Sequence, residues 1–260
     1  MMFEAGRLAA HMMQLTTFTA FGSIPGAETA LFSASEEGQR KYITELVEWA
    51  SAYCDEVPFP MTALPLRRIL DRLHEADFTV GDLGEMLRNA AERLRDEAGT
   101  LKLLRIQLDR VKYYETQQPF GLDVANNFPS VSFDALEACR CFALYRSTAC
   151  VFHLMRVLEI GLHAFADRFG VASDRTNWHN IIEGIEKAVR NLGIDPTTRP
   201  ADWKDQQEFF SQAASHFMIF KDAWRNYTAH ERGKFTEDEA ETILINVRSF
   251  MQKLATQLHE

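Results

Sequence analysis

The stretch Thr236-Glu237-Asp238-Glu239, with the residues that follow it, decides the fold class. Thr236 and Glu239 have the spacing of a capping box, in which each side chain bonds the other residue's backbone N–H at a helix start. The apolar residues after the box recur at steps of three and four: Ala240, Ile243, Leu244, Val247, Phe250, Met251 and Leu254. This period is typical of an amphipathic helix that packs on a core.

The same helical period runs along nearly the whole chain, whereas strand-like alternation bounded by tight turns is absent. The sequence therefore predicts an all-α fold, a bundle of helices. Besides the closing helix, expected helices span about 3 to 20, 35 to 56, 61 to 76, 80 to 97, 99 to 116, 132 to 170, 178 to 191 and 201 to 231. Ser132 is expected to cap the longest one.

Two turn-forming stretches indicate a domain boundary. Gln117-Gln118-Pro119-Phe120-Gly121 and Asn126-Asn127-Phe128-Pro129 interrupt the helical period. We therefore expect a helical N-terminal region over residues 1–125, whose role the sequence does not indicate, and a helical domain over 131–258.

One short constellation suggests chemistry: Lys221-Asp222-Ala223-Trp224-Arg225-Asn226-Tyr227-Thr228-Ala229-His230. Arg225 supplies a permanent planar cation suited to a phosphate, and His230 can exchange a proton near neutral pH. On an α-helix, Asp222, Asn226 and His230 form one row, while Arg225 lies about 140° around the axis from His230. In a two-fold dimer, two such pairs can line one cleft. The alternative is that both side chains only interact with the helix dipole and the last carbonyls.

This segment resembles the HEPN family, whose signature is an Arg, a polar residue, a few variable residues and a His on the last long helices. Here the signature reads Arg225-Asn226-Tyr227-Thr228-Ala229-His230. The stretch Tyr145–Glu159 looks like the first long helix of bacterial HEPN proteins, and Phe235–Ala240 resembles the start of the closing helix. The resemblance covers roughly residues 131–258.

The resemblance implies a metal-independent endoribonuclease, serving as a toxin or an antiviral defence effector and active as a homodimer, with an antitoxin or regulatory protein as a further partner. In such a reaction the 2′-hydroxyl of RNA attacks the neighbouring phosphate. His230 is expected to transfer the proton, Arg225 to hold the phosphate and stabilise its charge, and Asn226 to orient either group. Other HEPN proteins have lost catalysis. The second interpretation is therefore a non-catalytic dimerisation or binding module for RNA, a nucleotide or a protein.

Two acidic residues are second-tier candidates. Asp222 shares the row of Asn226 and His230. Glu159 can pair with Arg225 as part of the site, but we favour the interpretation that it forms an ordinary surface ion pair without a role in the site. His153 lies beside Phe152 and Met155, which we assign to the core, and is interpreted as a packing histidine.

Charge and composition limit the function classes. The net charge of −9 argues against a broad basic surface that coats long duplexes, so an RNA site must be local. Four cysteines at irregular spacing indicate reduced structural thiols, and ligand spacings for zinc are missing. The sequence predicts no metal and no cofactor, because Gly-rich phosphate loops and related motifs are absent. A clean signal peptide and a bilayer-spanning apolar segment are also absent, which predicts a cytoplasmic protein without membrane contact.

Overall fold

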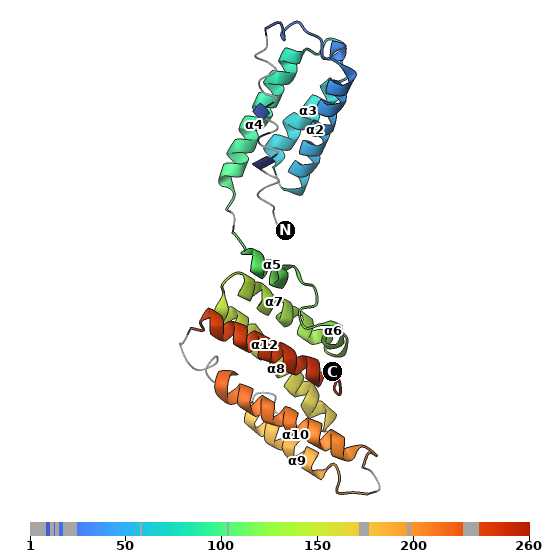
Figure 1. The fold of residues 1–260 in the computed structure, drawn as a ribbon, viewed down its shortest axis with the longest axis vertical. Helices are drawn as coiled ribbons and strands as arrows, with labels where there is room; N and C mark the ends of the chain where they lie inside the picture. Colours follow the sequence, from blue (N-terminus) through green and yellow to red (C-terminus); the bar gives the residue numbers. More distant parts are fainter. Residues whose placement is uncertain are drawn as a thin grey trace. The chain divides into compact units, whose positions relative to one another are not determined.

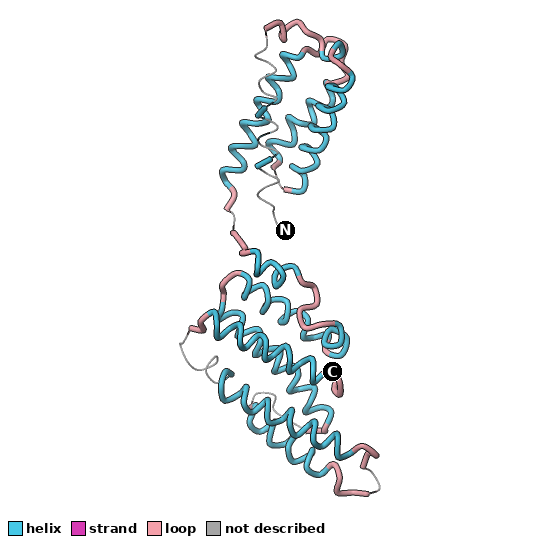
Figure 2. The backbone as a smooth tube through the Cα atoms, in the orientation of Figure 1, coloured by secondary structure: helices cyan, strands magenta, loops and turns pink. Residues whose placement is uncertain are grey.

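The computed structural model describes residues 9–10, 13, 16–17, 25–57, 59–102, 104–171, 177–196, 199–225 and 234–260. Within these ranges all regular secondary structure is helical, apart from an isolated bridge between Leu31 and Thr79 (Figure 2). The predicted all-α fold is confirmed. The chain divides into two compact units, Met1–Leu104 and Arg105–Glu260. Residues 105–125, which the sequence analysis placed in the N-terminal region, lie in the second unit.

The first unit is built on three helices, α2 (Glu37–Glu56), α3 (Pro60–Arg72) and α4 (Val80–Thr100), with α3 packed against both others (Figure 1). Their fully buried side chains are mainly aliphatic, with Val47, Leu66 and Ile69 at the centre. Polar side chains serve the helix ends. Glu97 of α4 accepts the N–H groups of Met61 and Thr62 at the start of α3, at 2.8 and 2.9 Å.

The second unit contains α5 (Leu108–Glu115), α6 (Leu122–Asn127), α7 (Ser132–Ala143), α8 (Ser147–Arg168), α9 (Trp178–Asn191), α10 (Trp203–Phe220) and α12 (Glu237–Leu254). In Figure 1, α8 lies at the centre of this unit, and it packs against α7, α9 and α12. Gly161 allows α12 to approach α8 closely, because a Cβ at this position would lie 3.1 Å from the Sδ of Met251. The predicted bounds of α9 and the apolar face of α12 are confirmed.

The predicted single helix from 132 to 170 is wrong. It is two helices, α7 and α8, which fold back and pack against each other. Between them Tyr145 has a φ of +59°, the left-handed region that side chains other than glycine rarely adopt. Its ring lies 4.2 Å from the guanidinium carbon of Arg110, which donates to the carbonyl of Phe142. The turn is therefore held by a tertiary contact. The prediction that Ser132 caps this helix is also wrong, because Val131 occupies the cap position and Ser132 is the first residue of α7.

The expected helix at 99 to 116 is not continuous in the structure. Its first two residues end α4, and among the other described residues of this range Leu108–Glu115 is helical. Leu104 and Leu108 are 72% and 92% exposed, so neither side chain packs on a core that would stabilise a helix there.

By length and composition α8 is apolar enough to cross a membrane, contrary to the expectation that no segment is. Most of its apolar side chains, including Leu154, Leu158 and Phe165, are buried in the core of the second unit. Packing on three neighbouring helices thus accounts for its composition.

Candidate functional site

The end of α10 rests on an aromatic cluster. Phe217 and Phe220 are buried, and both contact the ring of Phe250 on α12, with centroids 4.9 and 5.1 Å apart. Phe217 also meets the buried indole of Trp178, the first residue of α9, edge to face. These rings join α9, α10 and α12 and hold the end of α10 in place.

The α-helical geometry ends at Phe220, where the sequence analysis expected it to continue to 231. Residues Lys221–Arg225 instead form a π-helical segment, η4. A π-turn has more residues per turn than an α-helix, so the 100° wheel used to place side chains after Phe220 does not apply here. Its first two side chains pair with each other, Lys221 Nζ lying 2.7 Å from Asp222 Oδ1. Asp222 is thus engaged with its neighbour, and its carboxylate is mostly exposed.

Arg225, the last residue of η4, lies over an aromatic ring. Its guanidinium carbon is 5.9 Å from the ring centroid of Trp178, within the range of a cation–π contact. The Trp178 indole is 3% exposed, and its Nε1 has no hydrogen-bond acceptor among the described residues. The cation at the start of the Arg225–His230 motif is therefore held at the edge of the core without a carboxylate partner in the described ranges.

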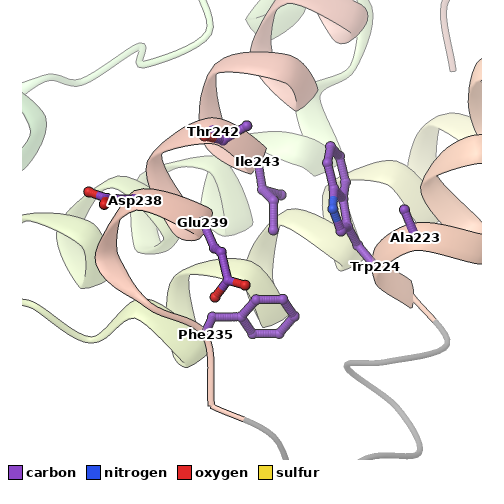
Figure 3. Close-up of a pocket in the computed structure, with 7 residues that line it drawn as sticks. All are labelled: Ala223, Trp224, Phe235, Asp238, Glu239, Thr242 and Ile243. Carbon is purple, nitrogen blue, oxygen red and sulfur yellow. The ribbon is translucent and has the colours of Figure 1, made fainter.

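An open pocket of about 390 Å³ lies between η4 and the start of α12. It is lined by Ala223, Trp224, Phe235, Asp238, Glu239, Thr242 and Ile243. Figure 3 shows the Trp224 indole on one side, Phe235 and Glu239 on the other, and the Asp238 carboxylate turned away. The Trp224 ring stacks on Phe220 at 5.2 Å, so the aromatic cluster continues into the pocket wall.

The acidic side of the pocket belongs to the capping box that the sequence predicts. Glu239 accepts the backbone N–H of Thr236 at 2.7 Å and its hydroxyl at 2.9 Å, and Thr236 in turn accepts the N–H of Glu239. These bonds, the backbone one foremost, lower the pKa of Glu239 below its ordinary value. Glu239 is therefore charged at neutral pH and held at the helix N-terminus, whose dipole favours it.

The remaining predicted site residues are not brought together with Arg225 in the described part of the chain. Asn226 and His230 lie outside the described residues. Glu159, on α8, makes no ion pair with Arg225. The hydrogen bond to Asp134 foremost raises the pKa of Arg156, and the charge of Glu159 adds to this shift. Arg156 is one helical turn away on the same face of α8.

A cluster that sequence reasoning missed lies where α7 and α8 face each other. Asp134, only 2% exposed, accepts from His153 Nδ1 at 2.8 Å and from Arg156 Nε at 2.9 and 3.0 Å. In one unbroken helix Asp134 and His153 would stand about 28 Å apart. The turn at Tyr145 brings them together, and no glycine or proline between 144 and 146 signals it. Phe152, which we assigned to the core, is 53% exposed beside this cluster, while Met155 is buried as expected.

The cysteines of the second unit are free, as expected for structural thiols. Cys139 and Cys150 are buried among apolar side chains. Burial raises the pKa of Cys139 to about 12 and that of Cys150 further, so both thiols are protonated at neutral pH. A protonated thiol is a poor nucleophile.

No protein-family model, curated protein or solved structure matches this chain. The similarity to the HEPN signature therefore stands on the quoted residues of the second unit, and the function is argued below from these residues and their geometry.

Proposed function

We propose that the second unit is a metal-independent endoribonuclease of the HEPN type, a toxin or defence effector that acts as a homodimer in the cytoplasm. The observation that carries the proposal is Arg225, which is held over Trp178 at the end of η4. It directly follows Trp224, which lines the open, partly aromatic pocket. Arg225 begins the Arg-Asn-x-x-x-His sequence that resembles the family signature.

The proposed reaction uses the RNA's own hydroxyl group. The 2′-oxygen attacks the neighbouring phosphorus, the bond to the 5′-oxygen breaks, and the products are a 2′,3′-cyclic phosphate and a 5′-hydroxyl. His230 transfers the proton, as base toward the 2′-hydroxyl or as acid toward the leaving oxygen, and a second copy supplies the other role. Arg225 binds the phosphate oxygens, and Asn226 orients the histidine or the phosphate.

The position of Arg225 suits this role. A cation on an aromatic face keeps its N–H donors for a ligand, because the ring contacts its flat face. Within the described ranges no carboxylate neutralises Arg225, in contrast to Lys221, which pairs with Asp222. A phosphate therefore does not have to displace an acidic partner from the described residues.

A non-catalytic binding module is the second candidate, and the acidic lining favours it. Asp238 and Glu239 both border the pocket, and carboxylates repel a phosphate backbone. They suit a cationic segment of a protein partner, with Arg225 and His230 serving helix-end or dimer contacts.

Cleavage of mixed cellular RNA in excess EDTA decides between the two. Wild type is expected to cut and to leave 2′,3′-cyclic phosphate ends, whereas Arg225→Ala and His230→Ala each lose activity about 100-fold or more, the usual effect of removing one preorganised group. Arg199→Ala is the matched control, because Arg199 also lies over an indole, that of Trp203 at 5.6 Å. His259→Ala, an exposed histidine, controls for the second variant.

Full activity in either site variant would contradict the ribonuclease assignment. The absence of cutting by folded, dimeric wild type would contradict it as well. In the second case the binding-module interpretation replaces it.

A further inference from the structure

The Asp134 cluster on α7 and α8 presents two nitrogen-bearing groups that it does not itself use. Arg156 donates to the two Asp134 oxygens through its Nε alone, at 2.9 and 3.0 Å. Its Nη1 and Nη2 make no hydrogen bond in the described ranges, and its side chain is 53% exposed, so a ligand can reach them. An ionised carboxylate 2.8 Å from His153 Nδ1 favours the proton on that nitrogen, which leaves Nε2 without a partner among the described residues.

The buried Asp134 carboxylate fixes the orientation of both the His153 imidazole and the Arg156 guanidinium. Asp134 lies in the first turn of α7, where the helix dipole favours its charge, and its side chain is 3% exposed. His153 and Arg156 are three residues apart and share one face of α8. The guanidinium and the imidazole are thus preorganised by one acid, with their unused nitrogens left for a ligand. A phosphate accepts from the free donors of Arg156, whereas Nε2 of His153 carries the lone pair in this tautomer and accepts a hydrogen bond.

Two exposed aromatic rings flank the imidazole. Phe133 is 64% exposed and Phe152 is 53% exposed. Both meet the His153 ring edge to face, with centroids 6.4 and 6.0 Å away. Burying either ring in a core would be favourable, so two exposed phenylalanines around one imidazole need another explanation. Aromatic faces beside an arginine are the usual platform for single-stranded bases.

The cluster also lies on the same helix as the edge of the pocket. Thr148 of α8 accepts the backbone N–H of Phe235, which lines the pocket, at 3.2 Å. Phe152 and Arg156 follow Thr148 at steps of four on the same face of α8, so Arg156 lies about 12 Å along the axis from it. A single strand leaving the pocket at Phe235 can follow this face.

We propose that Phe133, Phe152, His153 and Arg156 form a second binding site on the second unit, which takes one nucleotide of single-stranded RNA. The phosphate is held by Arg156 Nη1 and Nη2, His153 Nε2 accepts a hydrogen bond from the nucleotide, and the base stacks on Phe152 or Phe133. Asp134 is a positioning residue that orients both side chains and does not touch the ligand. The choice of RNA as ligand rests on the ribonuclease proposed above, whereas the site itself rests on the cluster.

A purely structural ion-pair cluster is the competing explanation. It accounts for the partners of buried Asp134, since a buried carboxylate needs them. It does not explain why the ring of Phe152 is exposed beside the cluster, because the cluster's hydrogen bonds join only Asp134, His153 and Arg156. Phe152→Ala therefore separates the two explanations, because it removes the platform and leaves the bonds to Asp134.

The test is binding of a short fluorescent single-stranded RNA that carries 2′-O-methyl groups, which the proposed reaction cannot cut. Phe152→Ala is expected to weaken binding about fivefold or more, the effect of losing one base stack. Arg156→Gln should also weaken it and reduce its salt dependence by one phosphate contact. Leu122→Ala, which removes a 61% exposed side chain, and Arg190→Gln, a 67% exposed arginine, are the matched controls. A thermal melt of each variant checks folding.

Cleavage assays on the same variants keep this site and the ribonuclease apart. If wild type cuts RNA, Phe152→Ala should raise KM with little change in kcat, as expected for a contact made in substrate and transition state alike. If wild type binds but does not cut, and Phe152→Ala loses binding, the site stands and the ribonuclease fails. Unchanged binding by folded Phe152→Ala, or no binding by wild type, overturns the site whatever the cleavage result.

Discussion

Both units start a long helix with the same device, yet they treat charge differently. Thr79 and Asp82 form a capping box at α4 of the first unit, and Thr236 and Glu239 form one at α12 of the second. Among the described residues, however, the buried charged side chains are Arg110 and Asp134, both in the second unit. In the first unit the cross-helix ion pair Arg67–Asp55 is exposed.

This difference indicates where function is concentrated. A buried charge costs free energy unless it is paired, and it is often retained because it fixes one arrangement of its neighbours. Arg110 fixes the turn before α8, and Asp134 fixes His153 and Arg156. The core of the first unit combines aliphatic side chains with Phe32, Phe59 and Phe78, and Glu97 satisfies the start of α3. We therefore expect the first unit to act as a scaffold.

The largest expected effect is a core cavity in the second unit. Phe217→Ala should reduce the free energy of unfolding by about 3–5 kcal/mol, because Phe217 is fully buried among the rings of Phe165, Trp178 and Phe250. It should also reduce RNA cleavage, since Trp178 supports Arg225.

Leu66→Ala is the counterpart in the first unit, with an expected loss of about 2–5 kcal/mol. Alkylation of buried thiols distinguishes the units, because Cys54 reports opening of the first and Cys139 of the second. Burial raises the pKa of each to about 12, so both react chiefly after opening. Equal acceleration at Cys54 and Cys139 in either variant would show that the two units open together and would remove the contrast.

The buried cation gives the next largest effect. Arg110→Ala removes a side chain that is 7% exposed, bonded to Glu237 and the Phe142 carbonyl, and stacked on Phe142 and Tyr145. We expect a loss of about 3 kcal/mol, from a charged hydrogen bond and desolvated cation–π contacts together. Faster hydrogen exchange in α5 and at the α7–α8 turn is the measurement.

Arg67→Ala tests the same change at an exposed pair, where both side chains are more than half exposed. The expected loss is below about 1 kcal/mol, as for surface ion pairs in general. Similar losses for Arg110→Ala and Arg67→Ala would refute the contrast in how the units treat charge.

Local sequence signals predict elements well where the local signal is also the cause. The Thr236–Glu239 box and the apolar stripe of α12 are both visible in the sequence, and α9 starts at Trp178 after its Asn177 cap. The α7–α8 turn cannot be predicted in this way. Its left-handed residue is Tyr145, and the side chain that holds it, Arg110, comes from another helix. The Asp134 cluster depends on that turn and was missed with it.

The candidate site also combines features that the sequence shows with contacts that only the structure shows. The type and order of Arg225, Asn226 and His230 are sequence facts, and the motif can be found without a structure. The support of Arg225 by Trp178 is a contact between α9 and η4, and the π-helical geometry of η4 overrides the α-helical wheel. Nothing in the spacing of Trp178 and Arg225 indicates that they meet.

Breaking each capping box should reduce stability less than Arg110→Ala does, and by nearly the same amount in the two units. Thr79→Ala and Thr236→Ala are each expected to cost about 1 kcal/mol, because each leaves the N–H of its own third helical residue without its side-chain acceptor. RNA cleavage should separate them, since Thr236 holds Glu239 and the start of α12 at the pocket wall. Thr79→Ala serves as the control, and a fall in cleavage with it would contradict a scaffold role for the first unit.

The smallest expected effect is the response of the two boxes to acid. Bonds from Thr79, backbone first, lower the pKa of Asp82, as those from Thr236 lower the pKa of Glu239. A lowered pKa means that the folded state favours the charged form. The stabilisation is therefore complete above the ordinary carboxylate pKa, roughly pH 4, and is lost as the pH falls through the lowered value.

Glu239→Gln and Asp82→Asn isolate this effect, because each keeps a side-chain acceptor but removes the titration. Each variant should be less stable than wild type at neutral pH and should approach it as the pH falls below about 4. Thermal melts between neutral pH and pH 3 measure the difference. A gap that stays constant with pH would mean that the charge on the helix dipole contributes nothing. A gap for Asp82 alone would mean that the two boxes differ in their surroundings, because the charge of Arg72 also favours the ionised form of Asp82.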